Sequence, residues 1–423
     1  MIITSAPTSV FESLESEVRS YCRIWPRVFE RAYGSRLHDE DGRTYLDFFT
    51  GAGSLNYGHN PPALKRALLD YVARDGVVQG LDMFTSAKRA FLEAFRDLVL
   101  APRGLDHKVM FPGPTGANAV EAALKLVRKV TGRQTVVSFT NSFHGMSLGA
   151  LAVSGNAFKR AGAGVPLAYS VPMPFDRYLE EDGEPDFRWF ERLLEDRGSG
   201  LDRPAAVIVE TVQGEGGINV ARPAWLRALA DLCRRQDMLL IVDDIQMGCG
   251  RTGAFFSFEE AGIVPDVVTL SKSISGYGLP MSLVLFRPGL DIWEPGEHNG
   301  TFRGHNPAFV TAAAALNTYW TDNQMEKQTL ARGELVEAAL GEIAAEHRRR
   351  GAAYRGRGLV WGLGFADPGH AVRVRARAFD LGLLVETSGP EDEVVKLLPP
   401  LTATPEELDE GLRVLARAVD ETV

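Results

Sequence analysis

Short, continuous runs of apolar residues alternate with helical segments through the middle of the chain. An alternating apolar–polar strand has one solvated face, whereas a continuous apolar run is typical of a strand covered on both faces. A helix is predicted at 117–130, and strands are predicted at 107–111, 134–139, 205–210, 238–243, 266–270 and 282–286. This order predicts an α/β fold whose large domain contains a mostly parallel sheet.

The two ends of the chain follow another pattern. Residues 36–49 predict a short hairpin around an Asp-Gly turn. After residue 320 come a long helical stretch, an α+β pattern and a last helix at 405–422, which begins with a capping box of Thr404 and Glu407. We therefore expect a large domain over 61–320 and a small α+β domain that combines residues 1–60 with residues 321–423.

Composition narrows the class of protein. The chain has 423 residues and a net charge of −9, which argues against a nucleic-acid or anionic-membrane partner. Three scattered cysteines, Cys22, Cys233 and Cys249, predict neither a disulfide framework nor a metal site, so no metal and a reducing, cytoplasmic location are expected. The N-terminal residues predict no signal peptide, and no apolar run is long enough to predict a membrane span.

Three charged residues stand at the carboxyl ends of predicted strands. They are Glu210, Asp243 and Lys272. In open parallel sheets, ligands bind outside these ends, so the three are expected to share one site. A lysine beside a buried acid has two interpretations: a structural ion pair, or a lysine that forms an imine with an aldehyde cofactor. Pyridoxal phosphate needs such a lysine, a carboxylate that keeps its ring nitrogen protonated, and a phosphate-binding cup.

A candidate for the phosphate cup opens the helix at 117–130. Thr115, Gly116 and Ala117 stand at its start, where small residues leave backbone N–H groups open to an anion and the helix dipole favours it. Phe143 could stack on a cofactor ring, and the neighbouring His144 could be a base, a ring neighbour or a histidine of the core. The stretch 248–253 matches G-x-G-x-x-G, but it does not open a helix, which argues against nicotinamide or flavin binding.

Six motifs in order resemble the class III pyridoxal-phosphate aminotransferases, a family with fold type I. The resemblance runs from about residue 25 to the end of the chain. Its motifs are the glycine cup at 113–121 with TGR at 131–133, FHG, ETVQGEGG (210–217), VDDIQMGCGRTG (242–253), LSKSISGYGLP (270–280) and GTFRGHNP (300–307).

The resemblance implies roles for the residues around the cofactor ring. Lys272 would hold pyridoxal phosphate as an imine and then move a proton between substrate and cofactor. Asp243 would pair with the ring nitrogen and Gln246 with the ring hydroxyl, while Phe143 and His144 would lie against the ring.

The resemblance also implies a phosphate site and a gate. Gly116 and Ala117, with Thr115 beside them, would bind the phosphate, and Thr301 would reach the phosphate of a neighbouring subunit, so a homodimer or larger homo-oligomer is expected. Glu210 would lie near the cofactor, and Glu215 would be a gate that moves between substrates.

Stretches 11–23, 243–263 and 293–306 narrow the resemblance to a branch of the family that serves ectoine synthesis. That branch implies transfer of the amino group of L-glutamate to L-aspartate 4-semialdehyde, giving L-2,4-diaminobutyrate and 2-oxoglutarate. Lys396 stands where many members carry a carboxylate-binding arginine, and Met146 stands where the 4-aminobutyrate enzymes carry another. Arg251 and Arg303 are candidates for the distal carboxylate of glutamate, or residues of purely structural role.

Other functions stay open on the sequence. One is an ornithine, acetylornithine or 4-aminobutyrate transaminase, or a semialdehyde aminomutase; Met146 and the N-terminal stretch argue against these. A second is a non-catalytic ligand-binding module on the same fold, against which the presence of both Lys272 and Asp243 argues. A third is a nicotinamide dehydrogenase.

Overall fold

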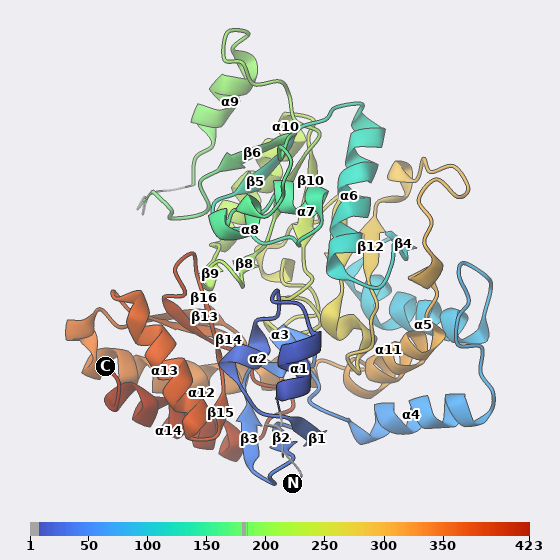
Figure 1. The fold of residues 1–423 in the computed structure, drawn as a ribbon. Helices are drawn as coiled ribbons and strands as arrows, with labels where there is room; N and C mark the ends of the chain where they lie inside the picture. The colour runs from blue at the N-terminus through green and yellow to red at the C-terminus, as the bar shows by residue number, and fades with distance from the viewer. Residues whose placement is uncertain (1–7, 180–182, 184) are drawn as a thin grey trace.

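The computed structural model describes residues 8–179, 183 and 185–423. The first seven residues, on which the prediction about a signal peptide partly rests, lie outside the described residues. Two bodies can be followed in Figure 1: an upper one around a large sheet, and a lower one in which both ends of the chain meet.

A seven-stranded sheet with the order β4-β12-β11-β10-β7-β5-β6 forms the centre of the upper body. All neighbours within β11-β10-β7-β5-β6 are parallel, and β12 is antiparallel to both of its neighbours, so the prediction of a mostly parallel sheet is confirmed. The strands are β4 (Lys108–Met110), β5 (Val136–Phe139), β6 (Ser170–Met173), β7 (Ala206–Val209), β10 (Leu239–Asp243), β11 (Val267–Leu270) and β12 (Leu283–Phe286). Only β6 was not predicted, because a proline and partly exposed positions interrupt its apolar pattern.

Helices cover both faces of this sheet, which explains the continuous apolar runs. Along β7, Val207 and Val209 pack in one core cluster with α10 (Pro223–Arg235). The alternate residues Ala206 and Ile208 pack in a second cluster with α6 (Gly116–Thr131). Successive side chains of a strand point to opposite faces, so a strand between two helices has mainly apolar residues at consecutive positions.

The lower body joins the two ends of the chain through a shared sheet. Its order is β1-β2-β3-β15, in which the C-terminal strand β15 (Leu383–Leu384) pairs in parallel with β3 (Thr44–Asp47). In Figure 1 the blue N-terminal strands accordingly lie beside the red C-terminal helices. The predicted hairpin is formed by β2 (Arg36–Asp39) and β3. The remaining strands are β1 (Phe29–Tyr33), β8 (Val212–Gln213), β9 (Asn219–Val220), β13 (Ala353–Arg357), β14 (Val360–Gly364), β16 (Glu386–Ser388) and β17 (Val394–Leu397).

The last helix, α14 (Pro405–Asp420), begins with the predicted capping box of Thr404 and Glu407. None of the described helices combines the length and the apolar character that a membrane crossing needs. The other α-helices are α1 (Ser9–Leu14), α2 (Tyr21–Ile24), α3 (Thr50–Gly53), α4 (Pro62–Ala73), α5 (Ser86–Phe95), α7 (Leu148–Ala152), α8 (Ala157–Ala161), α9 (Arg188–Glu195), α11 (Asn306–Tyr319), α12 (Gln324–Glu346) and α13 (Pro368–Asp380).

Candidate active site

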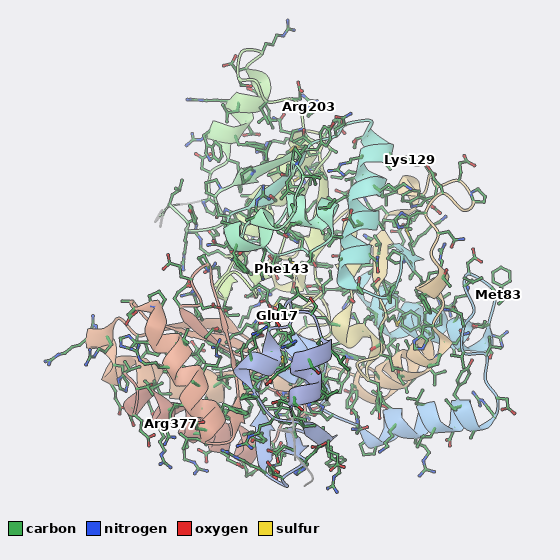
Figure 2. All side chains as sticks on the ribbon, in the orientation of Figure 1. Glu17, Met83, Lys129, Phe143, Arg203 and Arg377 are labelled. Carbon is green, nitrogen blue, oxygen red and sulfur yellow. The ribbon has the colours of Figure 1, made fainter. Side chains whose placement is uncertain are left out.

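The three charged strand ends meet at one edge of the large sheet. Glu210 follows β7, Asp243 ends β10 and Lys272 follows β11, and these three strands are parallel neighbours. All three residues line a pocket of about 180 Å³. Its other lining residues are Gly116, Ala117, Phe143, His144, Gly145, Glu215, Ile245, Gln246 and Met247. Figure 2 labels Phe143 between the upper body and the N-terminal segments of the lower one.

Asp243 is held as a buried hydrogen-bond acceptor. Its Oδ2 lies 2.6 Å from Nδ1 of His144, and its Oδ1 accepts from the Thr269 hydroxyl at 3.1 Å and from the Ile245 N–H at 3.2 Å. Burial opposes a charge on His144, but the Asp243 carboxylate outweighs burial and raises the pKa of His144. The contact with Asp243 therefore favours the protonated form of His144.

Glu210 is a buried acid without a cation bonded to it among the described residues. Burial raises its pKa to about 7, and His144 and the backbone N–H of Phe143, 3.0 Å from the carboxylate, only partly offset this. Near neutral pH, Glu210 is thus partly protonated, while its side chain fixes the position of the Phe143 backbone.

Lys272 stands in a strained position that aims its amine into the site. Its φ is +52°, a left-handed conformation that non-glycine residues adopt mainly where the surrounding structure imposes it. Its Nζ donates to the carbonyl oxygen of Ala52 at 2.8 Å, and the same oxygen accepts from Gln246 at 3.0 Å. Burial lowers the pKa of Lys272, although Glu215 opposes that shift.

Ala52 also belongs to the site, and sequence reasoning missed this residue. It belongs to α3, where Thr50, Gly51 and Ala52 all have positive φ. This segment comes from the N-terminal region and reaches the large sheet, so its carbonyl meets Lys272. The only sequence signal was the glycine-rich stretch TGAGS, which is compatible with many turns.

The start of α6 forms one wall of the pocket. Gly116 and Ala117 line it, and the first N–H groups of a helix have no partner inside that helix. Thr115, in contrast, is exposed and does not line the pocket. It caps the helix reciprocally with Asn118, accepting from the Asn118 N–H at 3.3 Å. Gly116 packs closely on the pocket residue Ile245: a Cβ at Gly116 would lie 3.0 Å from a methyl carbon of Ile245.

Glu215 and Lys396, both predicted for substrate binding, form an ion pair. The Lys396 amine lies 2.6 Å from Glu215 and also 2.8 Å from Glu386, an acid that sequence reasoning missed. Burial raises the pKa of Glu215 by itself, but Lys396 and Lys272 outweigh it and lower that pKa to about 2. Glu215 lines the pocket, whereas Lys396 and Glu386 are buried behind it.

The other predicted contacts lie elsewhere. Arg251 is fully buried and donates to the Leu359 carbonyl at 2.9 Å and to Asn56 at 2.7 Å, so its guanidinium supports the fold. Arg303 binds its own loop, at 3.2 Å from the Asn299 side chain. Thr301 is exposed and is not among the residues that line the pocket.

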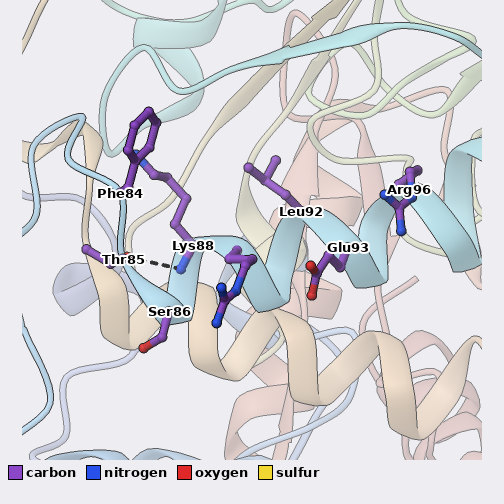
Figure 3. Close-up of a pocket in the computed structure, with 8 residues that line it drawn as sticks. Phe84, Thr85, Ser86, Lys88, Leu92, Glu93 and Arg96 are labelled. Atoms are coloured by element: carbon purple, nitrogen blue, oxygen red, sulfur yellow. Dashed lines mark hydrogen bonds between the residues drawn. The ribbon is translucent and has the colours of Figure 1, made fainter.

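A second hollow, of about 540 Å³, lies along α5 (Figure 3). It is lined by Phe84, Thr85, Ser86, Lys88, Arg89, Leu92, Glu93 and Arg96, and the dashed line marks the Lys88 N–H donating to the Thr85 hydroxyl at 3.1 Å. No predicted site residue within the described chain lines this hollow.

Comparison with known proteins identifies the family to which this chain belongs. A family model described as aminotransferase class-III matches residues 19–419. The chain belongs to this family. As a class III aminotransferase it is an enzyme that depends on pyridoxal phosphate and has small-molecule substrates.

Individual transaminases are also similar to this chain in sequence and in structure. The chain is 76% identical to the diaminobutyrate–2-oxoglutarate transaminase of Streptomyces avermitilis and 75% identical to that of Streptomyces anulatus, in both cases over 100% of both chains. The crystal structure of the ornithine aminotransferase from Toxoplasma gondii superposes with a TM-score of 0.84 at 26% identity, covering 98% of this chain and 94% of that one.

Proposed function

We propose that this chain is a diaminobutyrate–2-oxoglutarate transaminase, which transfers the amino group of L-glutamate to L-aspartate 4-semialdehyde and forms L-2,4-diaminobutyrate and 2-oxoglutarate. The observation that carries the proposal is the full-length identity of 76% to a relative of that name. The pocket supports it because one lysine, two buried acids and a helix start meet there.

The residues of the pocket fit pyridoxal phosphate. Lys272 contributes an amine that donates to the Ala52 carbonyl oxygen, and burial lowers its pKa, which favours the reactive neutral form. Nε2 of the buried His144 has no hydrogen-bond partner among the described residues, so the pocket wall presents one unsatisfied polar atom. The free N–H groups at Gly116 and Ala117 suit a phosphate.

The cofactor supplies an electron sink that stabilises the negative charge left when a substrate carbon loses its proton. The protein's own residues do the rest. Asp243 would pair with the ring nitrogen, Phe143 and Ile245 would confine the ring, and Gln246 would bind its hydroxyl. Lys272 would hold the cofactor through its Nζ, and as a free amine it would move the proton between the substrate carbon and the cofactor.

Two substrates with different reacting carbons must use this pocket in turn. The reacting carbon of glutamate carries a carboxylate, whereas the terminal carbon of diaminobutyrate carries none. Glu215 forms an ion pair with Lys396 when the bound substrate has no carboxylate at its reacting carbon. When the substrate has one, that carboxylate replaces Glu215 as the partner of Lys396. We therefore propose that Glu215 is an exchangeable counter-ion of Lys396 and that Lys396 is the cation that binds the substrate carboxylate.

The first experiment compares amino donors on the purified holoenzyme. We expect the visible absorption of the bound cofactor to change on addition of L-2,4-diaminobutyrate or L-glutamate, and at least about 10-fold faster than with ornithine or 4-aminobutyrate at equal concentration. A change with ornithine or 4-aminobutyrate alone would keep the family and refute the diaminobutyrate assignment. No change with any amine would refute the proposed activity.

We also propose that the active form is a homodimer or a larger homo-oligomer. Apolar side chains are exposed at five nearby positions of the chain, Val77, Val78, Leu81, Met83 and Phe84, and Phe84 lines the hollow of Figure 3. The Gly80 N–H donates to the Gly304 carbonyl at 2.8 Å, so this apolar surface adjoins the loop of Thr301 and the exposed Phe302. A second copy covering this surface would bury the apolar groups and bring Thr301 to a neighbouring pocket.

Phe84→Asp is expected to shift the oligomer towards monomer and to lower activity in parallel, because it places a charge on the apolar surface at a fully exposed position. Light scattering measures the mass, and the diaminobutyrate reaction measures the activity. Val264→Asp, at an exposed apolar residue far from this surface in the sequence, is the matched control and should change neither. A wild-type chain that is monomeric and fully active would contradict the proposal.

We also propose domain boundaries at 60/61 and 320/321 and a cytoplasmic location for this chain. The pairing of β15 with β3 supports a small domain that contains both ends of the chain.

A further inference from the structure

The ammonium group of Lys396 is paired with two carboxylates, although a gate formed by Glu215 needs only one of them. Its amine lies 2.6 Å from Glu215 and 2.8 Å from Glu386. The side chain of Glu215 is 21% exposed, whereas those of Glu386 and Lys396 are 5% and 0% exposed. Only Glu215 of the three lines the pocket, so only Glu215 is placed to leave when a ligand enters.

Glu386 is fixed in place on the far side of Lys396. The two residues are direct partners across the antiparallel strands β16 and β17. The hydroxyl of Tyr21, from α2, donates to the other carboxylate oxygen of Glu386 at 3.4 Å. The Tyr21 ring is in turn packed against Phe49 and Trp25, with centroids 5.0 and 5.9 Å away.

We propose that Glu386 is a positioning residue of the gate: it stays on Lys396 as a permanent counter-ion, so that Glu215 can leave and a substrate carboxylate can take its place. The physical reason is the cost of an unpaired buried charge. If Glu215 were the sole partner, its departure would leave the ammonium group of Lys396 without a counter-ion in a water-poor environment, and removing one partner of a buried pair is strongly unfavourable.

The inference rests on the proposed function and predicts an asymmetry between the two half-reactions. Glutamate has a carboxylate on its reacting carbon and needs the gate open. Diaminobutyrate reacts at a carbon without a carboxylate and leaves the gate closed. Loss of the negative charge at Glu386 therefore makes opening harder and slows the glutamate half-reaction, but leaves the diaminobutyrate half-reaction nearly unchanged.

The test measures both half-reactions separately by stopped-flow absorbance of the holoenzyme. For Glu386→Gln we expect kcat/KM with L-glutamate to fall about 10- to 100-fold, and kcat/KM with L-2,4-diaminobutyrate to stay within about threefold of wild type. Glu391→Gln, an exposed acid on the same β16–β17 hairpin, is the matched control and should leave both unchanged.

A second variant covers the case in which Glu386→Gln fails to fold. Tyr21→Phe keeps both acids and removes only the hydroxyl that donates to Glu386, and it should slow the glutamate half-reaction about two- to fivefold with the same selectivity. Equal slowing of both half-reactions, or of neither, would overturn the role of Glu386. A wild-type enzyme that reacts with neither amine would instead refute the proposed function.

Discussion

Lys272→Ala is expected to lower transamination by more than about 10³-fold, because in the proposed mechanism the same amine both holds the cofactor and moves the substrate proton. In the described chain, Lys272 is the lysine that lines the pocket, and its Nζ is held there by the Ala52 carbonyl at 2.8 Å. A steady-state assay with L-glutamate and the semialdehyde measures the loss, and thermal unfolding checks that the variant is folded.

One further variant at this position separates the effect of the positive charge from that of the reactive amine, and a variant of another lysine serves as the control. Lys272→Arg keeps the positive charge, but a guanidinium stays protonated in proteins and cannot act as the nucleophile or as the base, so it should be as inactive as Lys272→Ala. Lys65→Ala removes an exposed lysine of α4 and should retain wild-type activity. If Lys272→Ala kept more than about a tenth of wild-type activity, proton transfer by this amine would be contradicted.

Asp243→Asn is expected to cause the next largest loss, about 10³-fold in kcat/KM, which corresponds to about 4 kcal/mol of transition-state stabilisation. The substitution keeps the size of the side chain but removes the negative charge. A neutral amide no longer favours a protonated ring nitrogen, and His144, 2.6 Å away, loses the partner that raises its pKa. The measurement is kcat/KM for each substrate, together with cofactor content.

Thr269→Val is the matched control for Asp243→Asn. It removes the hydroxyl that donates to Asp243 at 3.1 Å and leaves the carboxylate charge in place. Its loss should be small, about 10-fold at most, since one neutral hydrogen bond contributes about 0.5–1.5 kcal/mol. Equal losses in the two variants would mean that Asp243 acts through packing and not through its charge.

The architecture of the large sheet could be read from the chain because burial on both faces leaves a local pattern. All six predicted strands belong to the seven-stranded sheet, and three of them, β7, β10 and β11, bring Glu210, Asp243 and Lys272 together at one edge. The seventh strand, β6, was not predicted because Pro172 and its partly exposed positions interrupt the apolar pattern. The capping box at Thr404 was equally readable, since cap and helix are neighbours in the chain.

Contacts between distant segments had no such local pattern. Thr115 was predicted to bind the cofactor, yet its side chain caps α6 with Asn118, and either use suits a threonine before a helix. Arg251 was a candidate for a substrate carboxylate, but it is fully buried and bonded to the fold. Residue type alone does not distinguish these uses, because each depends on which way the side chain points.

The sequence by itself determined the α/β class and the edge of the sheet at which Glu210, Asp243 and Lys272 meet. Those features follow from burial and from short-range spacing, which the chain carries locally. Only the tertiary structure decided that the Ala52 carbonyl holds Lys272 and that Glu386 shares Lys396 with Glu215. Lys272 and Ala52 are 220 positions apart in the sequence, and Lys396 and Glu215 are 181 positions apart. Only the register and packing of the folded chain bring such distant residues together.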